Sequence, residues 1–153
     1  GIRVTGEVAL DCTCDAVGSI RVDIEALFST GLPNTPMAGA GIQVVSGNFL
    51  TARPYGIHDG VDYGYTGAIR KVDRAALLQN LQAGSIVMLS PLAYSVTGEV
   101  FNVNSEEVAT YTASAIGADK LIFLTEKRLA DARGRLISSM TPNTPPISEL
   151  MKQ

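Results

Sequence analysis

The first part of the chain carries apolar residues at helical spacing. Between residues 7 and 29 they recur at spacings close to three and four positions, with acidic residues and Arg21 among them: Val8, Val17, Ile20, Ile24, Leu27 and Phe28. This period places apolar side chains on one face and predicts an amphipathic helix. Gly31, which is followed by Pro33 and Pro36, predicts where the helix ends.

The next two segments have the composition of strands. Residues 41–54 are rich in β-branched and aromatic residues and stop at Pro54, which predicts one strand, or two strands broken at Gly47. Residues 58–72 contain several glycines and alternate apolar with polar positions. This pattern predicts short hairpin strands that lie outside the core.

A helix and a buried strand are predicted in the middle of the chain. Asp73 is a suitable N-cap for a helix that ends at Gly84, and three of its side chains are expected to face inward: Ala76, Leu77 and Leu81. Residues 85–91 form a continuous apolar run that ends at a proline. A run of this kind is typical of a parallel strand that is buried on both faces.

Strands and helices continue to alternate toward the end of the chain. Residues 97–103 predict a returning hairpin strand, residues 105–116 a helix, and residues 120–125 another buried strand. This alternation predicts an α/β layered fold in which a largely parallel central sheet is flanked by helices. Residues 142–146 are expected to form a loop, and residues 147–153 to begin another helix.

Composition limits the class of protein. The chain has 153 residues, of which 46% are hydrophobic and 18% charged, enough for one domain with a core. A net charge of −3 with scattered basic residues argues against nucleic-acid binding, and no apolar run approaches the roughly 20 residues of a membrane helix. We expect a cytoplasmic protein without an N-terminal signal, and residues 1–153 as part of a single longer domain.

Several residues that could carry chemistry have ordinary explanations. Cys12 and Cys14 lie in a predicted helix, where their spacing points them in different directions, and the only histidine, His58, is far along the chain. We therefore expect two free thiols and no metal site. His58 lies beside Asp59 and Asp62 without a nearby nucleophile. We therefore do not expect His58 to act as a general base, and we expect the two aspartates to shape turns through Asx hydrogen bonds.

A cluster of polar residues lies at the start of the predicted helix 105–116. Asn104 can be the N-cap of this helix, and Glu107 follows three residues later in a capping-box arrangement. The other interpretation is a ligand site, because ligands of α/β folds gather where strands end and helices begin. Capping explains Asn104 and Glu107 but leaves Asn102 without a role, so both interpretations stay open.

Four stretches of the chain have the form of known family motifs: GIRVT (1–5), VVSGNF through RKVD (44–73), LQAGSIV through NVNSEEVAT (81–110) and GADKLIFLTE (117–126). Together they resemble the amino-acid-kinase family, in its N-acetylglutamate kinase and N-acetylglutamate synthase branches. Residues 44–73 are closer to the synthase branch. The resemblance reaches from Arg3 to about Met140, and it implies an amino-acid-kinase-like fold that is incomplete here.

The resemblance implies roles for individual residues. The arginine of the family's G-L-R-V-T motif binds a carboxylate of N-acetylglutamate, and Arg3 matches it. In the family's N-x-N-x-D motif the first asparagine contacts the same ligand. Its match is Asn102, and the second asparagine is Asn104. Glu106 stands where kinases carry an aspartate that organises phosphoryl transfer, and its longer side chain argues against that chemistry.

A second difference from the kinases lies in residues 125–134. The sequence TEKRLADARG places bulky side chains where kinases carry a glycine-containing turn that approaches the nucleotide. The lysine-and-glycine phosphate loop of the family is also absent from this chain. We therefore expect no ATP site and no cofactor in this chain.

These differences favour the synthase branch. The resemblance then implies a kinase-like domain that is inactive alone, binds an amino-acid ligand (N-acetylglutamate, glutamate or arginine), and serves arginine regulation and assembly of a homo-oligomeric ring. The parent enzyme would use acetyl-CoA to acetylate the amino group of L-glutamate, the first step of arginine biosynthesis. The alternatives are an N-acetylglutamate kinase that uses ATP and a non-catalytic amino-acid-sensing module.

Overall fold

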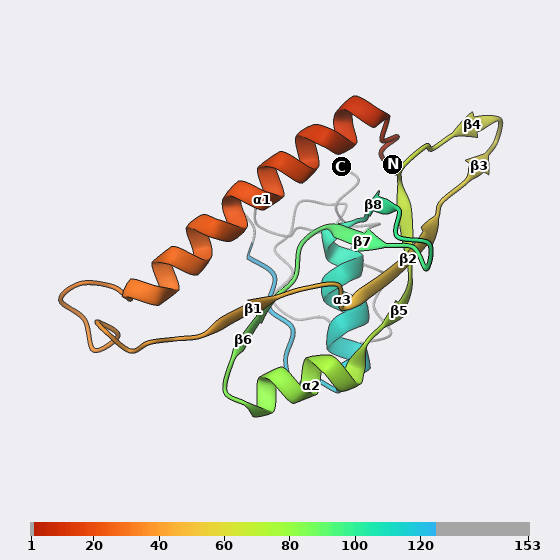
Figure 1. Ribbon diagram of the computed structural model, residues 1–153. Coiled ribbons are helices and arrows are strands. Elements are labelled where there is room, and N and C mark those ends of the chain that lie inside the picture. Colours follow the sequence, from red (N-terminus) through yellow and green to blue (C-terminus); the bar gives the residue numbers. More distant parts are fainter. Residues whose placement is uncertain (1, 125–153) are drawn as a thin grey trace, which may run out of the picture. The chain divides into compact units, whose positions relative to one another are not determined.

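The computed structural model describes residues 2–124 (Figure 1). Its elements are α1 (Glu7–Thr30), β1 (Val44–Ser46), β2 (Leu50–Pro54), β3 (Ile57–His58), β4 (Val61–Asp62), β5 (Gly67–Val72), α2 (Arg74–Gln82), β6 (Ile86–Met88), β7 (Leu92–Tyr94), β8 (Val100–Asn102) and α3 (Ser105–Ile116). All of them lie within one compact unit, Arg3–Leu121. The predictions for residues 125–134 (no glycine-containing turn of the kinase type), for the loop at 142–146 and for a helix beginning at 147–153 concern residues outside the described part.

The long helix predicted from the apolar period is confirmed as α1. It begins after Gly6 and ends at Gly31, whose φ of 66° is accessible to glycine and whose N–H donates to the carbonyl oxygen of Leu27. The predicted apolar face is only partly covered: Val17, Ile24 and Phe28 are half-buried, whereas Val8, Ile20 and Leu27 are exposed. The one buried residue of this helix, Leu10, was not among those predicted. No helix among the described residues combines the length and apolarity needed to cross a bilayer.

The strands form one four-stranded sheet and two strand pairs. The four-stranded sheet has the order β5-β2-β7-β8, in which β2 and β7 are parallel and the other pairs antiparallel. β1 and β6 form a parallel pair, and β3 and β4 a hairpin that extends beyond the ends of β2 and β5 (Figure 1). The α/β class and the break at Gly47 are confirmed, while the four-stranded sheet is mixed rather than largely parallel.

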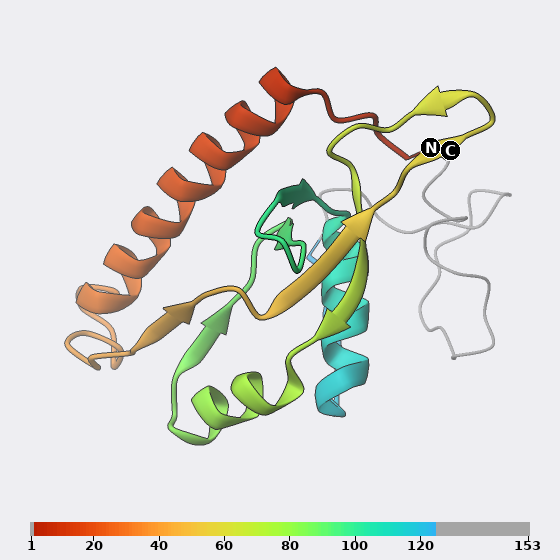
Figure 2. The same ribbon diagram turned by 45° about the vertical axis from the view of Figure 1, so that its right-hand side comes forward.

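The core lies between the four-stranded sheet and α3. Its buried members come from β2, β5, β7, β8, the residue after β8 and the start of α3: Leu50, Ala52, Ile69, Ala93, Phe101, Val103 and Val108. α3 packs against β5 and α2, and Figure 2 shows it alongside β5. Burial of these apolar side chains is the main force that holds the sheet to the helix.

β5 corrects the prediction that residues 58–72 contribute no core strand. Gly67 and Ile69 of β5 are buried, because β5 pairs with β2 and faces β8. A Cβ at position 67 would lie 2.6 Å from Cβ of Phe101, so only glycine permits this approach. The glycine that made the segment resemble an exposed hairpin is thus the residue that allows its burial.

Three other burial predictions are wrong within the described residues. Leu81 is 40% exposed, whereas Leu77 in the same helix is 1% exposed as predicted. Ile86 of β6 is 39% exposed, because β6 has one described neighbour strand and not two covered faces. Residues 120–124 form no strand, and Ile122 is 75% exposed. An apolar run becomes a buried strand only beside a pairing partner, which residues 2–124 do not supply here.

Candidate functional site

Three segments that are far apart in sequence meet at one place. Thr5 forms a parallel bridge with Gly64, and Thr66 forms a parallel bridge with Asn102. The backbone N–H of Tyr65 donates to the carbonyl of Thr5 at 2.8 Å, and that of Asn102 donates to the carbonyl of Tyr65 at 2.9 Å. These bonds bring the segment of Arg3 beside the segment of Asn102, which is the pair that the sequence motifs singled out.

Buried hydroxyl groups connect the same segments. The Thr66 hydroxyl lies 2.7 Å from the carbonyl oxygen of Arg3 and 3.1 Å from Oγ1 of Thr5. The side-chain amide of Asn102 donates from Nδ2 to Oγ1 of Thr5 at 3.2 Å. Thr5 is 1% exposed and Thr66 is 6% exposed, so these bonds satisfy polar groups that water does not reach.

Thr5 and Thr66 were missed at the level of sequence. Thr5 is 61 residues from Thr66 and 97 residues from Asn102, so no local spacing relates them. The one available signal was the position of Thr5 inside the GIRVT motif, two residues after Arg3. A polar residue within a largely apolar stretch is a candidate for a buried hydrogen bond.

Arg3 is exposed at the place where these segments meet, which we call the junction (Arg3, Thr5, Thr66 and Asn102), and its backbone carbonyl accepts a hydrogen bond from Thr66. Within residues 2–124 the sole ion pair joins Arg21 Nε to Glu25 Oε1 at 3.8 Å, so no described carboxylate neutralises Arg3. A planar guanidinium suits a carboxylate ligand, because it offers paired N–H donors. The geometry therefore leaves Arg3 available for an acidic group.

The start of α3 confirms the capping interpretation of Asn104. Oδ1 of Asn104 accepts a hydrogen bond from the backbone N–H of Glu107 at 3.0 Å. The reciprocal bond of a full capping box is not formed among the described residues. Glu106 is half-buried in the first turn, where its carboxylate accepts a hydrogen bond from the Ser105 hydroxyl at 3.3 Å. Its negative charge interacts favourably with the positive end of the helix dipole.

The hairpin residues have structural contacts of their own. His58 Nε2 lies 3.0 Å from the carbonyl oxygen of Tyr55, and the rings of these two residues lie 4.4 Å apart. Oδ1 of Asp62 accepts from the backbone N–H of Gly64 at 2.9 Å, and Asp59 adopts a φ of 51° in the turn. The turn-forming role expected for these aspartates is confirmed.

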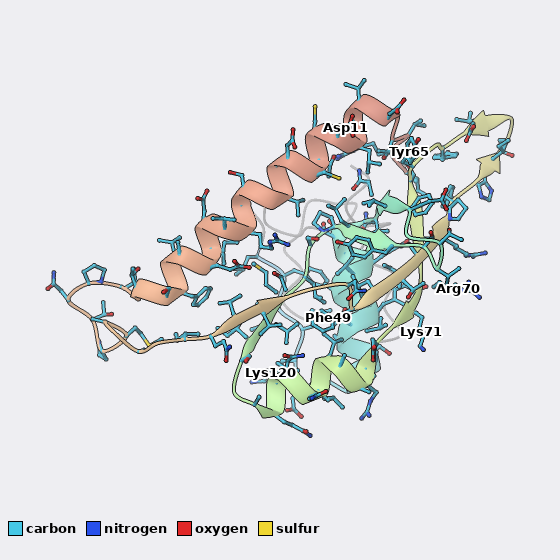
Figure 3. The ribbon with its side chains drawn as sticks, in the orientation of Figure 1. Asp11, Phe49, Tyr65, Arg70, Lys71 and Lys120 are labelled. Carbon is cyan, nitrogen blue, oxygen red and sulfur yellow. The ribbon has the colours of Figure 1, made fainter. Side chains whose placement is uncertain are left out.

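Tyr65 links the hairpin to the junction, and Figure 3 shows it near the N-terminal end of α1. Arg70 and Lys71, also labelled there, are exposed on β5. Both of these cations come after the buried part of β5, whereas Thr66 immediately precedes that strand. The junction of Arg3, Thr5, Thr66 and Asn102 is therefore separate from the exposed cations of β5.

The cysteines lie on α1 as free thiols. Burial raises the pKa of the Cys14 thiol, and the negative charges of Asp11 and Asp15 raise it further. Within residues 2–124 no group of three or more His, Cys, Asp or Glu side chains is arranged to hold a metal ion.

Comparison with known proteins gives a consistent set of relatives. The sequence model of the "Amino acid kinase family" matches residues 3–143. The amino-acid acetyltransferase of Ralstonia nicotianae is 58% identical over 126 residues, which cover 82% of this chain and 28% of that protein. The amino-acid acetyltransferase of Photobacterium profundum is 53% identical over 144 residues, which cover 94% of this chain and 33% of that protein. The chain thus spans about a third of these relatives.

Solved structures show the same relationship. A crystal structure of N-acetylglutamate synthase from Neisseria gonorrhoeae, complexed with coenzyme A and L-arginine, matches with a TM-score of 0.79 and 39% identity, over 90% of this chain and 32% of that chain. The structure of smu.665 from Streptococcus mutans matches with a TM-score of 0.61 and 23% identity, over 84% of this chain and 51% of that chain. The second match shows the fold alone.

Proposed function

The chain belongs to the amino acid kinase family, and on that premise we propose that it is the kinase-like segment of an N-acetylglutamate synthase. The observation that carries the proposal is 58% identity to an amino-acid acetyltransferase across 82% of the chain. The parent protein would transfer the acetyl group of acetyl-CoA to the amino group of L-glutamate, as the first step of arginine biosynthesis. Acetyl-CoA is a co-substrate of that parent protein.

Regulation and assembly are the roles we assign to this segment. The gonococcal synthase that this chain resembles is complexed with both coenzyme A and L-arginine, and the chain covers 32% of it. A kinase-like segment that contributes no acetyl-transfer residue leaves that reaction to the rest of the parent protein. Arginine, the end product of the pathway, would then inhibit acetyl transfer through this part of the molecule.

An amino-acid ligand is the substrate class we assign to the junction. Arg3 would pair with a carboxylate of N-acetylglutamate, glutamate or arginine, and Asn102 would contact the same ligand. Support comes from the hydrogen bonds that bring these segments together and from the unneutralised Arg3 guanidinium among residues 2–124. Asn104 and Glu106 follow directly after Asn102 and would border this site, Asn104 as the helix cap.

Kinase chemistry has less support. Phosphoryl transfer depends on close positioning, and Glu106 is longer than the aspartate found in the kinases. Its half-buried side chain accepts from Ser105 and contributes charge at the start of α3. We therefore treat N-acetylglutamate phosphorylation with ATP as the competing outcome of the test below.

Assembly and location follow from the same proposal. The parent protein would be a homo-oligomer, and α1 leaves large apolar side chains exposed that a partner could cover: Val8, Ile20, Val22 and Leu27. Cys12 and Cys14 are free thiols, which fits the reducing cytoplasm in which we place the protein.

The proposal is tested on the full-length parent protein with two assays run side by side. Glutamate and acetyl-CoA are supplied while release of the CoA thiol is followed, and N-acetylglutamate and ATP are supplied while ADP is followed. We expect thiol release without ADP. ADP formation that depends on N-acetylglutamate would show that Glu106 performs the work of the kinase aspartate, and the synthase assignment would fail.

A further inference from the structure

The side chains of Thr5, Thr66 and Asn102 form a series of hydrogen bonds. Which group donates in each bond follows from the number of protons that each side chain carries. The Thr66 hydroxyl lies 2.7 Å from the Arg3 carbonyl oxygen, which can only accept, so the single Thr66 proton is donated there. The Thr5 hydroxyl then donates its own proton across the 3.1 Å contact to Oγ1 of Thr66. In the remaining 3.2 Å contact Thr5 accepts, and Nδ2 of Asn102 donates.

This direction determines how the Asn102 amide is oriented. The oxygen and nitrogen of an asparagine amide are distinguished by their hydrogen-bond partners, and an acceptor at Thr5 selects the nitrogen. Both threonines are more than nine-tenths buried, so water does not compete for these contacts. Asn102 itself is half-buried, and none of the hydrogen bonds among residues 2–124 uses its Oδ1. The amide oxygen is therefore left to accept from a ligand.

We propose that Thr5 and Thr66 are positioning residues that hold Oδ1 of Asn102 as the acceptor for an N–H group of the amino-acid ligand. This inference rests on the proposed function, in which Arg3 and Asn102 share one ligand. The Arg3 guanidinium pairs with the carboxylate, and Oδ1 accepts from the nitrogen on the same α-carbon. An N-acylated amino acid or a free amino acid supplies that N–H, whereas a tertiary amide does not.

A rotated amide would have the opposite preference. If Nδ2 faced the ligand, Asn102 would donate and would select a carbonyl oxygen instead of an N–H. Without the hydroxyl of Thr5 the amide has no buried acceptor that selects between the two orientations. The hydroxyl pair therefore sets which ligand atom the site recognises.

The test uses the full-length protein and two probes that differ at one N–H: N-acetyl-L-glutamate and N-acetyl-N-methyl-L-glutamate. Each is titrated calorimetrically into the wild type and into Thr5→Ser, Thr5→Val and Thr66→Val. Binding that persists in Arg3→Ala belongs to other parts of the protein and is subtracted. The readout is the ratio of the two dissociation constants, which a general loss of stability does not change.

We expect the wild type to prefer the N–H probe by about tenfold, the size of a single hydrogen bond to a partly buried amide. Thr5→Ser keeps the hydroxyl and the ratio. Thr5→Val keeps the shape but not the hydroxyl, so the ratio falls to about twofold. Thr66→Val lowers the ratio of dissociation constants by the same amount. Without the Thr66 hydroxyl as acceptor, the Thr5 hydroxyl can donate to Asn102 instead, and the amide is no longer held in one orientation.

An unchanged ratio in both valine variants, including equal weakening of the two probes, would overturn the positioning role. Absence of any Arg3-dependent binding in the wild type would overturn it as well. Thiol release from acetyl-CoA and glutamate is measured on the same preparations. A wild type that releases thiol but shows no Arg3-dependent binding refutes this inference and the ligand role of the junction, while the synthase assignment stands. A wild type that releases no thiol refutes the synthase assignment.

Discussion

Asn102 and Asn104, which are two positions apart, have different structural roles in this chain. Asn104 is exposed and accepts from the backbone N–H of Glu107, so it serves α3 locally. Asn102 is half-buried and donates to Thr5, which is 97 residues away. The first role follows from local sequence, because N-caps have a known residue preference. The second could not be predicted, because it depends on a chain junction that the fold creates.

The cap makes a prediction that separates the two asparagines. Asn104→Ala removes the acceptor for the N–H of Glu107 and should lower stability by about 1 kcal/mol, while Asn104→Ser should retain most of it. Hydrogen exchange should speed up at the first turn of α3 in Asn104→Ala. Asn102 lies outside the cap, so Asn102→Ala should leave exchange in α3 unchanged. It should instead speed up hydrogen exchange at the backbone N–H of Tyr65, which donates to the carbonyl oxygen of Thr5. Equal acceleration of α3 exchange in both variants would contradict these roles.

Cys14 gives a prediction about pH. Its pKa is raised by burial and then by Asp11 and Asp15, so its thiolate appears at a higher pH than in an unperturbed cysteine. Because the folded state holds the proton more tightly, this thiol favours folding at low pH, and that contribution is lost as pH rises through the raised pKa. In Cys12→Ser protein, the rate of alkylation by iodoacetamide should rise at higher pH than for N-acetylcysteine.

Removing a nearby charge should reverse part of this shift. Asp11→Asn should move the alkylation profile of Cys14 toward lower pH, since Asp11 is the larger of the two charge effects. Asp23→Asn, further along the same helix, is the matched control and should leave the profile in place. A profile that is the same in Cys12→Ser protein with and without Asp11→Asn would exclude the charge effect.

At the scale of elements, local patterns located the helices better than they located buried strands. The helix periods at 7–29 and 105–116 and the break at Gly47 all correspond to elements of the structure. The burial of β5 was missed because it depends on β2 and on the approach of Phe101 to Gly67. The period of apolar residues predicts which secondary structure a single segment favours. Burial of a strand depends in addition on which other segments the fold places beside it.

The segment of Arg3 and Thr5 lies against residues 64–66, and this contact requires a glycine at position 64. Gly64 has a φ of +54°, and a Cβ there would lie 2.6 Å from the Thr5 carbonyl oxygen, which accepts from Tyr65. Gly64→Ala should therefore cost more than the roughly 1–2 kcal/mol of a left-handed alanine, because the Thr5 contact must also open.

Gly60→Ala is the matched control for this substitution. Its φ of +77° has the same backbone cost, but a Cβ there meets nothing within 4 Å. Urea unfolding of the two variants should differ, with Gly64→Ala the less stable and with faster exchange at Tyr65. Equal unfolding midpoints would mean that the Thr5 junction contributes nothing to stability.

At the scale of the whole molecule, the prediction of the amino acid kinase family is confirmed by the match over residues 3–143. Of the site, Asn102 was singled out by its position before a predicted helix, whereas Arg3 was found only through the resemblance, and the roles of both stay predictions. Thr5 and Thr66 were not found, since hydrogen bonds across 61 and 97 residues leave no period in the sequence. Family motifs thus point to residues with a predicted ligand role, while the buried threonines that hydrogen-bond to those segments become visible only in the fold.

The most direct measurement is the rate of CoA thiol release by the full-length protein, with glutamate and acetyl-CoA, across a range of arginine concentrations. The proposed role of this segment in an arginine-regulated synthase predicts a rate that falls steadily as arginine is added. Thiol release that is independent of arginine would contradict the regulatory role, and no thiol release at all would contradict the synthase assignment.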